Sequence, residues 1–147
     1  MKILIIEDDK IKIDKLTSFL SNNDFDLRES FQSGLDALKN SQYDLLILDM
    51  TIPLWEKVNN DINQNYEQFG GEKILREMKR KKIIVPVILF TMFDKFPIGS
   101  DVLTFEQISH KYKENFDFYI GSVYYDSRND DWKSNLLSLI ENINYES

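Results

Sequence analysis

The sequence predicts an α/β fold in which a five-stranded parallel sheet is covered on both faces by helices. Short apolar runs of strand length alternate with longer segments whose apolar residues recur at helical spacing. The chain has 147 residues, enough for one domain with a sizeable core but too few for two ordinary domains. We therefore expect a single domain over 1–147.

The first half of the chain contains three of the predicted strands, at 2–6, 24–29 and 44–48. The run at 44–48 is almost continuously apolar, as expected for a strand buried on both faces. Helices are predicted at 8–21, 33–39 and 71–81 because apolar residues recur there every three or four positions. These apolar positions are Ile11, Leu16, Phe19 and Leu20 in the first helix, Leu35 and Leu38 in the second, and Ile74, Leu75 and Met78 in the third.

The second half contributes strands at 85–91 and 116–120 and helices at 104–115 and 130–143. Thr104 and Gln107 have the spacing of a capping box, so the helix should begin at this threonine.

Two long connections exceed what a minimal fold of this class needs, at about 54–70 and 93–103. The first is rich in asparagine, and the second contains Pro97 and Gly99. Connections of this length in compact domains are usually functional or disordered, so we predict that both are insertions.

Composition excludes several classes of function. With 25 acidic against 18 basic residues, the formal charge is −7, which argues against direct nucleic-acid binding. Cysteine is absent, which excludes disulfides and thiolate metal sites. The N-terminus enters a strand at once, unlike a signal peptide, and no apolar run approaches the ~20 residues that span a bilayer. We expect a cytoplasmic protein that makes no membrane contact.

Acidic residues follow two of the predicted strands directly. Glu7, Asp8 and Asp9 come after the first strand, and Asp49 ends the run at 44–48. If these strands are parallel neighbours, their carboxylates meet at one edge of the sheet, where they raise each other's pKa. A hard cation such as Mg²⁺ would offset that repulsion. Helix capping explains Asp8 or Asp9 taken singly, and Asp9 is interpreted as a cap or a solvated residue. Glu7, Asp8 and Asp49 together, with Thr91, favour a cation site.

Three motifs together resemble the receiver domain of two-component response regulators. They are the segments 2–9 (KILIIEDD), 43–53 (YDLLILDMTIP) and 85–91 (VPVILFT), which occur in the family's order and extend the resemblance over almost the whole chain. The resemblance is to the chemotaxis-regulator type, which implies the flavodoxin-like (βα)5 three-layer sandwich.

The resemblance implies a role for each matching residue. Asp49 matches the phosphoacceptor, and Mg²⁺ would be held by Glu7, Asp8, Asp49 and the backbone carbonyl of Thr51. Thr91 matches the hydroxyl that turns toward the phosphoryl group. The switch aromatic corresponds to Phe118 or Tyr119. The implied partners are a histidine kinase or phosphotransfer protein and a downstream protein target, and a homodimer through the last two helices and final strand is a further option.

One departure from the family concerns its lysine at the end of the last strand, where this chain has Gly121 or Ser122. A cation could come instead from a loop, and the candidates are Lys57, Lys95 and Arg128.

Two functions stay open at this point: a stand-alone receiver phosphorylated on Asp49, and a pseudo-receiver that keeps the fold as a phosphorylation-independent binding module. An aspartyl phosphohydrolase is disfavoured, because Thr51 stands where such enzymes place a second acid. We therefore do not expect an enzyme.

Overall fold

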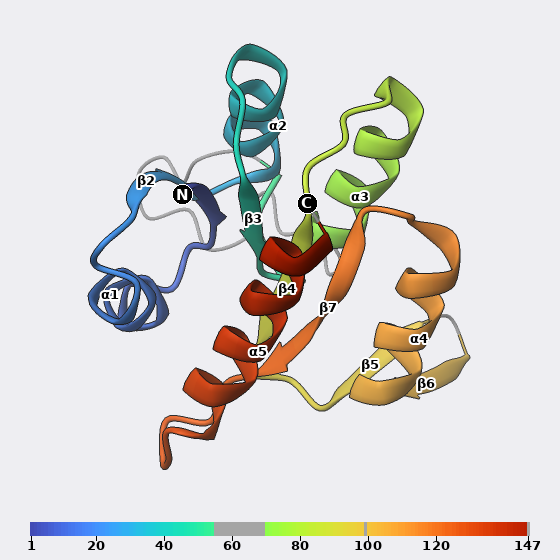
Figure 1. Cartoon of the computed structure of the whole chain (residues 1–147). Helices are drawn as coiled ribbons and strands as arrows, with labels where there is room; N and C mark the ends of the chain where they lie inside the picture. Colours follow the sequence, from blue (N-terminus) through green and yellow to red (C-terminus); the bar gives the residue numbers. More distant parts are fainter. Residues whose placement is uncertain (55–69, 99, 147) are drawn as a thin grey trace, which may run out of the picture. The chain divides into compact units, whose positions relative to one another are not determined.

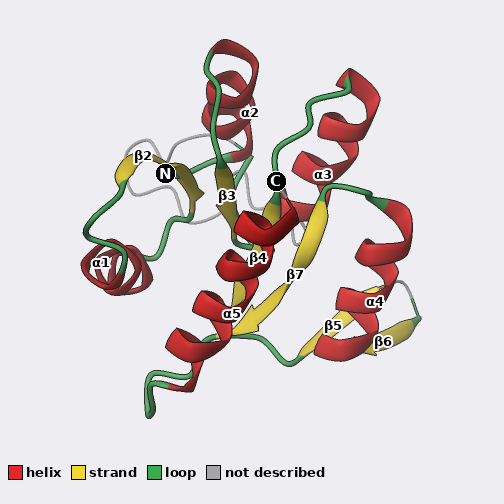
Figure 2. Cartoon of the chain, in the orientation of Figure 1, coloured by secondary structure: helices red, strands yellow, loops and turns green. Residues whose placement is uncertain are grey.

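The computed structural model describes residues 1–54, 70–98 and 100–146 (Figure 1). Strands and helices alternate along most of the chain (Figure 2). In order they are β1 (Lys2–Ile6), α1 (Lys10–Phe19), β2 (Asp24–Arg28), α2 (Phe31–Asn40), β3 (Leu45–Leu48), α3 (Gly70–Lys81), β4 (Val87–Thr91), β5 (Lys95–Ile98), β6 (Asp101–Thr104), α4 (Phe105–Asn115), β7 (Tyr119–Tyr124) and α5 (Asp131–Glu146).

Five strands form one sheet in the order β2-β1-β3-β4-β7, and the pairs β1–β2, β1–β3 and β4–β7 are parallel. The predicted α/β fold class is therefore confirmed. The chain divides into two compact units, Met1–Val85 and Pro86–Ser147. The expectation of one domain over 1–147 stays a prediction. Among the described helices, none combines the length and the apolar character that crossing a membrane requires.

In the first unit, β1 lies between β2 and β3, and the strand order reverses at this point. Ile3 is opposite Phe25 on one side and Leu45 on the other. Ligands in open α/β sheets bind at the carboxyl ends of the strands beside such a reversal. Ile6 pairs with Leu48 in the register of β1 and β3, so the residues that follow both strands emerge at one edge.

Helix α1 begins two residues later than predicted, and of its predicted apolar positions it buries Leu16 and Leu20 but not Ile11. Asp9 is its N-cap and accepts a hydrogen bond from the amide of Ile11 at 2.9 Å, so the helix begins at Lys10 instead of residue 8. The buried positions within the helix are Lys12, Ile13 and Leu16, whereas Ile11 is 65% exposed. The capping interpretation of Asp9 is confirmed, and Ile11, one of the apolar residues that predicted the helix, lies on its exposed side.

The second unit contains β4, β5, β6, α4, β7 and α5. Strand β7 begins at Tyr119, so the predicted strand at 116–120 was placed about three residues too early. Phe116 is instead the C-cap of α4, and its buried ring packs against Tyr112. In the sequence, this apolar residue could not be told from the first residue of a buried strand. The capping box of Thr104 and Gln107 is confirmed.

The structure describes one of the two predicted insertions much more completely than the other. Most of the one at 54–70 lies outside the described residues. The one at 93–103 contains an antiparallel hairpin, in which β5 pairs with β6 and Lys95 lies opposite Thr104.

Helix α3 begins directly against the chain that leaves β3. The amide of Gly71 donates a hydrogen bond to the carbonyl of Met50 at 2.9 Å. A Cβ atom at Gly71 would lie 2.4 Å from the backbone oxygen of Asp49 and 2.8 Å from Cα of Met50. Backbone atoms cannot turn aside as a side chain does, so a glycine is required here.

Gly71→Ala should destabilise the fold by about 1–3 kcal/mol through overpacking, although alanine is the better helix former. Chemical denaturation measures this change. Gly121→Ala is the control, since its new methyl would meet only Leu139 side-chain atoms, at 3.0 Å or more. Equal stability of Gly71→Ala and wild type would contradict the close approach of α3.

Candidate functional site

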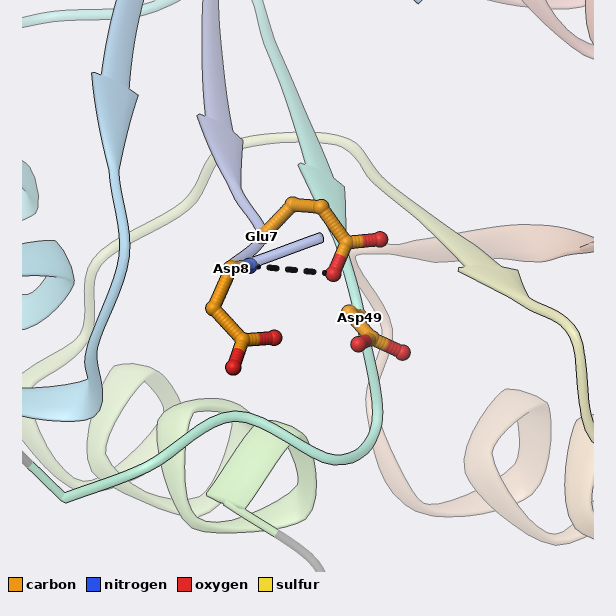
Figure 3. A group of neighbouring side chains, drawn as sticks. All are labelled: Glu7, Asp8 and Asp49. Carbon is orange, nitrogen blue, oxygen red and sulfur yellow. Dashed lines mark hydrogen bonds between the residues drawn. The ribbon is translucent and has the colours of Figure 1, made fainter. Parts of the chain in front are cut away.

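Three carboxylates meet where β1 and β3 end. Glu7 and Asp8 follow β1, Asp49 follows β3, and one carboxylate oxygen from each lies within 4.8 Å of the others. Figure 3 shows these side chains around one small region, with the Asp8 amide donating to Glu7 Oε2 at 3.0 Å. The Asp49 amide donates to the carbonyl of Ile6 at 3.0 Å, which ties the two strand ends together. The strands thus bring together the acids that the sequence analysis singled out.

The site is almost closed to solvent. Glu7 and Asp49 are 2% and 3% exposed, while Asp8 is partly exposed. Among the described residues, Asp49 Oδ1 finds no hydrogen-bond partner although it is buried. A buried carboxylate oxygen without a partner is costly, and oxygen is the ligand type that Mg²⁺ prefers. The residues present therefore fit a hard divalent cation.

A lysine that the sequence analysis did not consider enters the same site from α1. Lys12 Nζ lies 2.5 Å from Glu7 Oε1 and 3.4 Å from Asp49 Oδ2, and its side chain is only 2% exposed. One sequence signal could have revealed it. Lys12 is four residues before Leu16 and eight before Leu20, so it occupies the buried stripe of its helix.

The structure describes two of the three loop cations that were proposed from the sequence, and both are exposed. Arg128 is 84% exposed and pairs with Asp126 at 2.8 Å. Lys95 is an exposed residue of β5. Lys57 lies outside the described residues.

The charges in the site do not balance. Burial and, second, the charge of Asp49 raise the pKa of Glu7 to about 9, outweighing the opposite effect of Lys12. Burial alone would lower the pKa of Lys12, but Asp49 and Glu7 outweigh burial and raise it. The acidic groups of the site therefore disfavour each other's charged forms, and an additional cation would reduce that repulsion.

Two threonines named in the sequence analysis lie in different units. The Thr51 hydroxyl donates to Asp49 Oδ2 at 3.4 Å, and ligation by its carbonyl stays a prediction. Thr91 ends β4 in the second unit and is fully buried. Its hydroxyl oxygen accepts a hydrogen bond from the Phe93 amide at 3.1 Å. The switch role of Thr91 stays a prediction.

The candidate switch aromatics lie at the start of β7. Phe118 precedes the strand, and Tyr119 pairs with Val87 at the opposite end of β4 from Thr91. The Tyr119 hydroxyl is hydrogen-bonded to the Ser122 hydroxyl, and burial raises the pKa of Tyr119 to about 12. Both side chains are thus remote from Thr91 along this strand pair, and the aromatic role of either stays a prediction.

The residue opposite Thr91 is Tyr124, which was not one of the two predicted switch aromatics. Its ring packs edge-on against Phe105 of α4, with centroids 6.1 Å apart. Strand β7 carries no lysine, and it continues past both Gly121 and Ser122.

No protein-family model matches the chain. Among curated proteins, it is 25% identical over 140 residues to uncharacterized protein y4jR of Sinorhizobium fredii, covering 91% of this chain and 93% of that protein. It is 33% identical over 96 residues to the transcriptional regulatory protein QseB of Escherichia coli O157:H7. That match covers 64% of this chain but only 37% of QseB.

The chain is also similar to solved structures of response regulators over nearly its whole length. The receiver domain of Francisella response regulator 1452 superposes with a TM-score of 0.64 at 16% identity, covering 99% of this chain and 98% of that one. Response regulator TrrA of Thermotoga maritima, solved with Mg²⁺-BeF, gives a TM-score of 0.59 at 20% identity, covering 94% and 97%. The chain therefore has the flavodoxin-like fold of response regulator receiver domains.

Proposed function

We propose that this chain is a receiver that accepts a phosphoryl group on Asp49 and signals by protein–protein contact. The observation that carries the proposal is the cluster of Glu7, Asp8 and Asp49, in which the buried Asp49 Oδ1 finds no hydrogen-bond partner among the described residues. Mg²⁺ would be held by these three carboxylates and the Thr51 carbonyl, and when bound it would neutralise charge on the phosphoryl oxygens.

The transfer itself is a simple displacement. A carboxylate oxygen of Asp49 forms a bond to phosphorus while the bond between phosphorus and the donor's leaving group breaks. With acetyl phosphate the electron pair leaves on acetate, and no proton has to move. The chain's contribution is to fix the nucleophile, which the Thr51 hydroxyl and Lys12 do through their contacts with Asp49 Oδ2.

Thr91 offers a route from modification to a change of shape. Its hydroxyl oxygen now accepts from the Phe93 amide, so turning that hydroxyl toward a phosphoryl group would release the start of the 92–94 segment. That segment leads into β5, and the Phe105 amide donates to the carbonyl of Asp94 at 2.9 Å. A change at Thr91 would thereby reach the hairpin and the start of α4.

We further propose that the protein is cytoplasmic. Its partners would be a histidine kinase or phosphotransfer protein as phosphoryl donor and a downstream protein target that receives the signal. A homodimer would use α4, β7 and α5. Catalytic turnover as a phosphohydrolase is disfavoured, because the group beside Asp49 is the Thr51 hydroxyl, which is a poor general acid.

Acetyl phosphate labelling tests the proposed function. The purified chain should gain the mass of one phosphoryl group in the presence of Mg²⁺ and none in the presence of a chelator. Borohydride reduction of the acyl phosphate followed by peptide mapping should place the label on Asp49. Folded protein that gains no mass under these conditions would exclude phosphotransfer.

The pseudo-receiver is the second candidate, and the ion pairs of Lys12 favour it. This lysine already compensates part of the acidic site from within the chain, which a metal-free binding module would need. The absence of labelling would favour this candidate. It also predicts that Asp49→Asn binds the protein's partner as well as wild type under phosphorylating conditions.

A further inference from the structure

We propose that Lys12, at the start of α1, supplies the positive charge that contacts the phosphoryl group on Asp49. This inference rests on the proposed function and assigns a residue that the sequence comparison with receivers does not suggest. It explains how the chain could carry out phosphoryl transfer although β7 contains no lysine.

The position of Lys12 follows from the way α1 begins. Asp9 caps the helix, so Lys12 lies in its first turn. Side chains on a helix lean toward its N-terminus, which here adjoins the end of β1. The long apolar stem of Lys12 is therefore buried, while its ammonium group reaches the carboxylates at the strand ends.

The distance between Lys12 Nζ and Asp49 is short enough for the ammonium group to move from the carboxylate to a phosphoryl group. Lys12 Nζ is already 3.4 Å from Asp49 Oδ2, and a phosphoryl oxygen lies only one phosphorus atom beyond the carboxylate oxygen. A small rotation of the flexible lysine stem would bring the ammonium group from Asp49 onto the phosphoryl group. Phosphorylation replaces one negative carboxylate by a more negative group, so the attraction to Lys12 grows.

The surroundings of Lys12 are those of a site residue and not of a solvent-exposed surface lysine. Its side chain is 2% exposed, and within the described part of the chain it pairs with two acids, Glu7 and Asp49, both of the site. Lys15, one turn further along α1, is exposed. A positive charge in a site with little water acts more strongly on developing negative charge than one in solvent.

The reaction that Lys12 assists is the balanced displacement described above. An Asp49 oxygen bonds to phosphorus, the donor bond breaks, and acetate leaves with the electron pair. Lys12 keeps its proton throughout and provides only charge and hydrogen bonds to the phosphoryl oxygens.

Two measurements on Lys12→Met test the inference: the rate of acetyl phosphate labelling and the affinity for Mg²⁺ by calorimetry. Methionine keeps the length of the stem and removes the charge. We expect labelling to slow by about a hundredfold, the loss typical of removing one preorganised charge partner. Mg²⁺ affinity should be equal or higher, because a competing cation has gone. Lys12→Arg should retain part of the labelling rate, and Lys15→Met should match wild type.

The outcomes separate this inference from the proposed function. If wild type takes no label, the proposed function fails. If wild type is labelled and Lys12→Met is labelled equally fast, the proposed function stands and the role of Lys12 is refuted. Parallel loss of Mg²⁺ binding and labelling in a folded variant would show that Lys12 only maintains the shape of the site, and would also refute it.

A chemical rescue covers the case in which Lys12→Met does not fold. The chain has no cysteine, so Lys12→Cys introduces a single thiol. Alkylation of the unfolded variant with 2-bromoethylamine, followed by refolding, restores an ammonium group on a side chain of lysine length. Rescue of labelling by this reagent but not by iodoacetamide supports the inference. Equal labelling of both alkylated forms contradicts it.

Discussion

Asp49→Asn should abolish phosphoryl uptake. In the absence of Mg²⁺, it should also raise the free energy of unfolding by about 1 kcal/mol, which is close to the free energy of a one-unit pKa shift. The first effect follows because the amide is not a nucleophile for phosphorus. The second follows because the pKa of Glu7 is raised first by burial and second by the charge of Asp49, so removing that charge relieves part of the strain on Glu7. Lys12 keeps Glu7, its nearer partner at 2.5 Å, when Asp49 is neutralised.

Intact mass spectrometry measures the uptake, and urea denaturation with a chelator present measures the stability. Asp14→Asn is the matched control, since it removes an exposed acid from α1 and should change neither quantity. Retained labelling in Asp49→Asn would move the phosphoacceptor elsewhere. A large loss of stability would show that Asp49 is needed to hold Lys12, in conflict with the charge imbalance.

Lys12→Met should lower the free energy of unfolding by about 3 kcal/mol, the usual cost of removing one partner of a buried ion pair. The variant leaves Glu7 and Asp49 buried without an ion-pair partner among the residues that the structure describes. Protonation of Glu7, whose pKa is already raised to about 9, limits the loss. Millimolar Mg²⁺ should restore part of the stability, because it supplies positive charge at the same acids.

Lys15→Met is the comparison for this variant, because it removes a solvent-exposed lysine from the same helix. Its stability should stay within about 0.5 kcal/mol of wild type. Equal denaturation midpoints for Lys12→Met and Lys15→Met would mean that Lys12 does not stabilise the acidic site.

Local patterns predicted most of the fold. The apolar runs that became β1 and β3 are buried on both faces, so nothing but a central strand suits them. The acids that end these runs could be placed together because parallel neighbours share an edge. Thr104 and Gln107 marked the start of α4 because a capping box acts within one turn.

Errors arose where burial depends on distant parts of the chain. Ile11 was one of the apolar residues that predicted α1, yet it is exposed, since the helix buries Lys12, Ile13 and Leu16 instead. Phe116 looked like the beginning of a strand, yet its ring packs on Tyr112 at the end of a helix. An apolar side chain in the sequence does not reveal which element buries it.

The sequence by itself determined the alternation of strands and helices, the acids at the strand ends and the match of Asp49 to a phosphoacceptor. These depend on periodicity and on residues adjacent in the chain. The tertiary structure alone decided that the cation beside Asp49 is Lys12 of α1. The reason is physical: whether a lysine is solvated or paired depends on what lies within a few ångströms of its ammonium group. At the end of a long side chain, that neighbourhood is set by the packing of α1 against the strands.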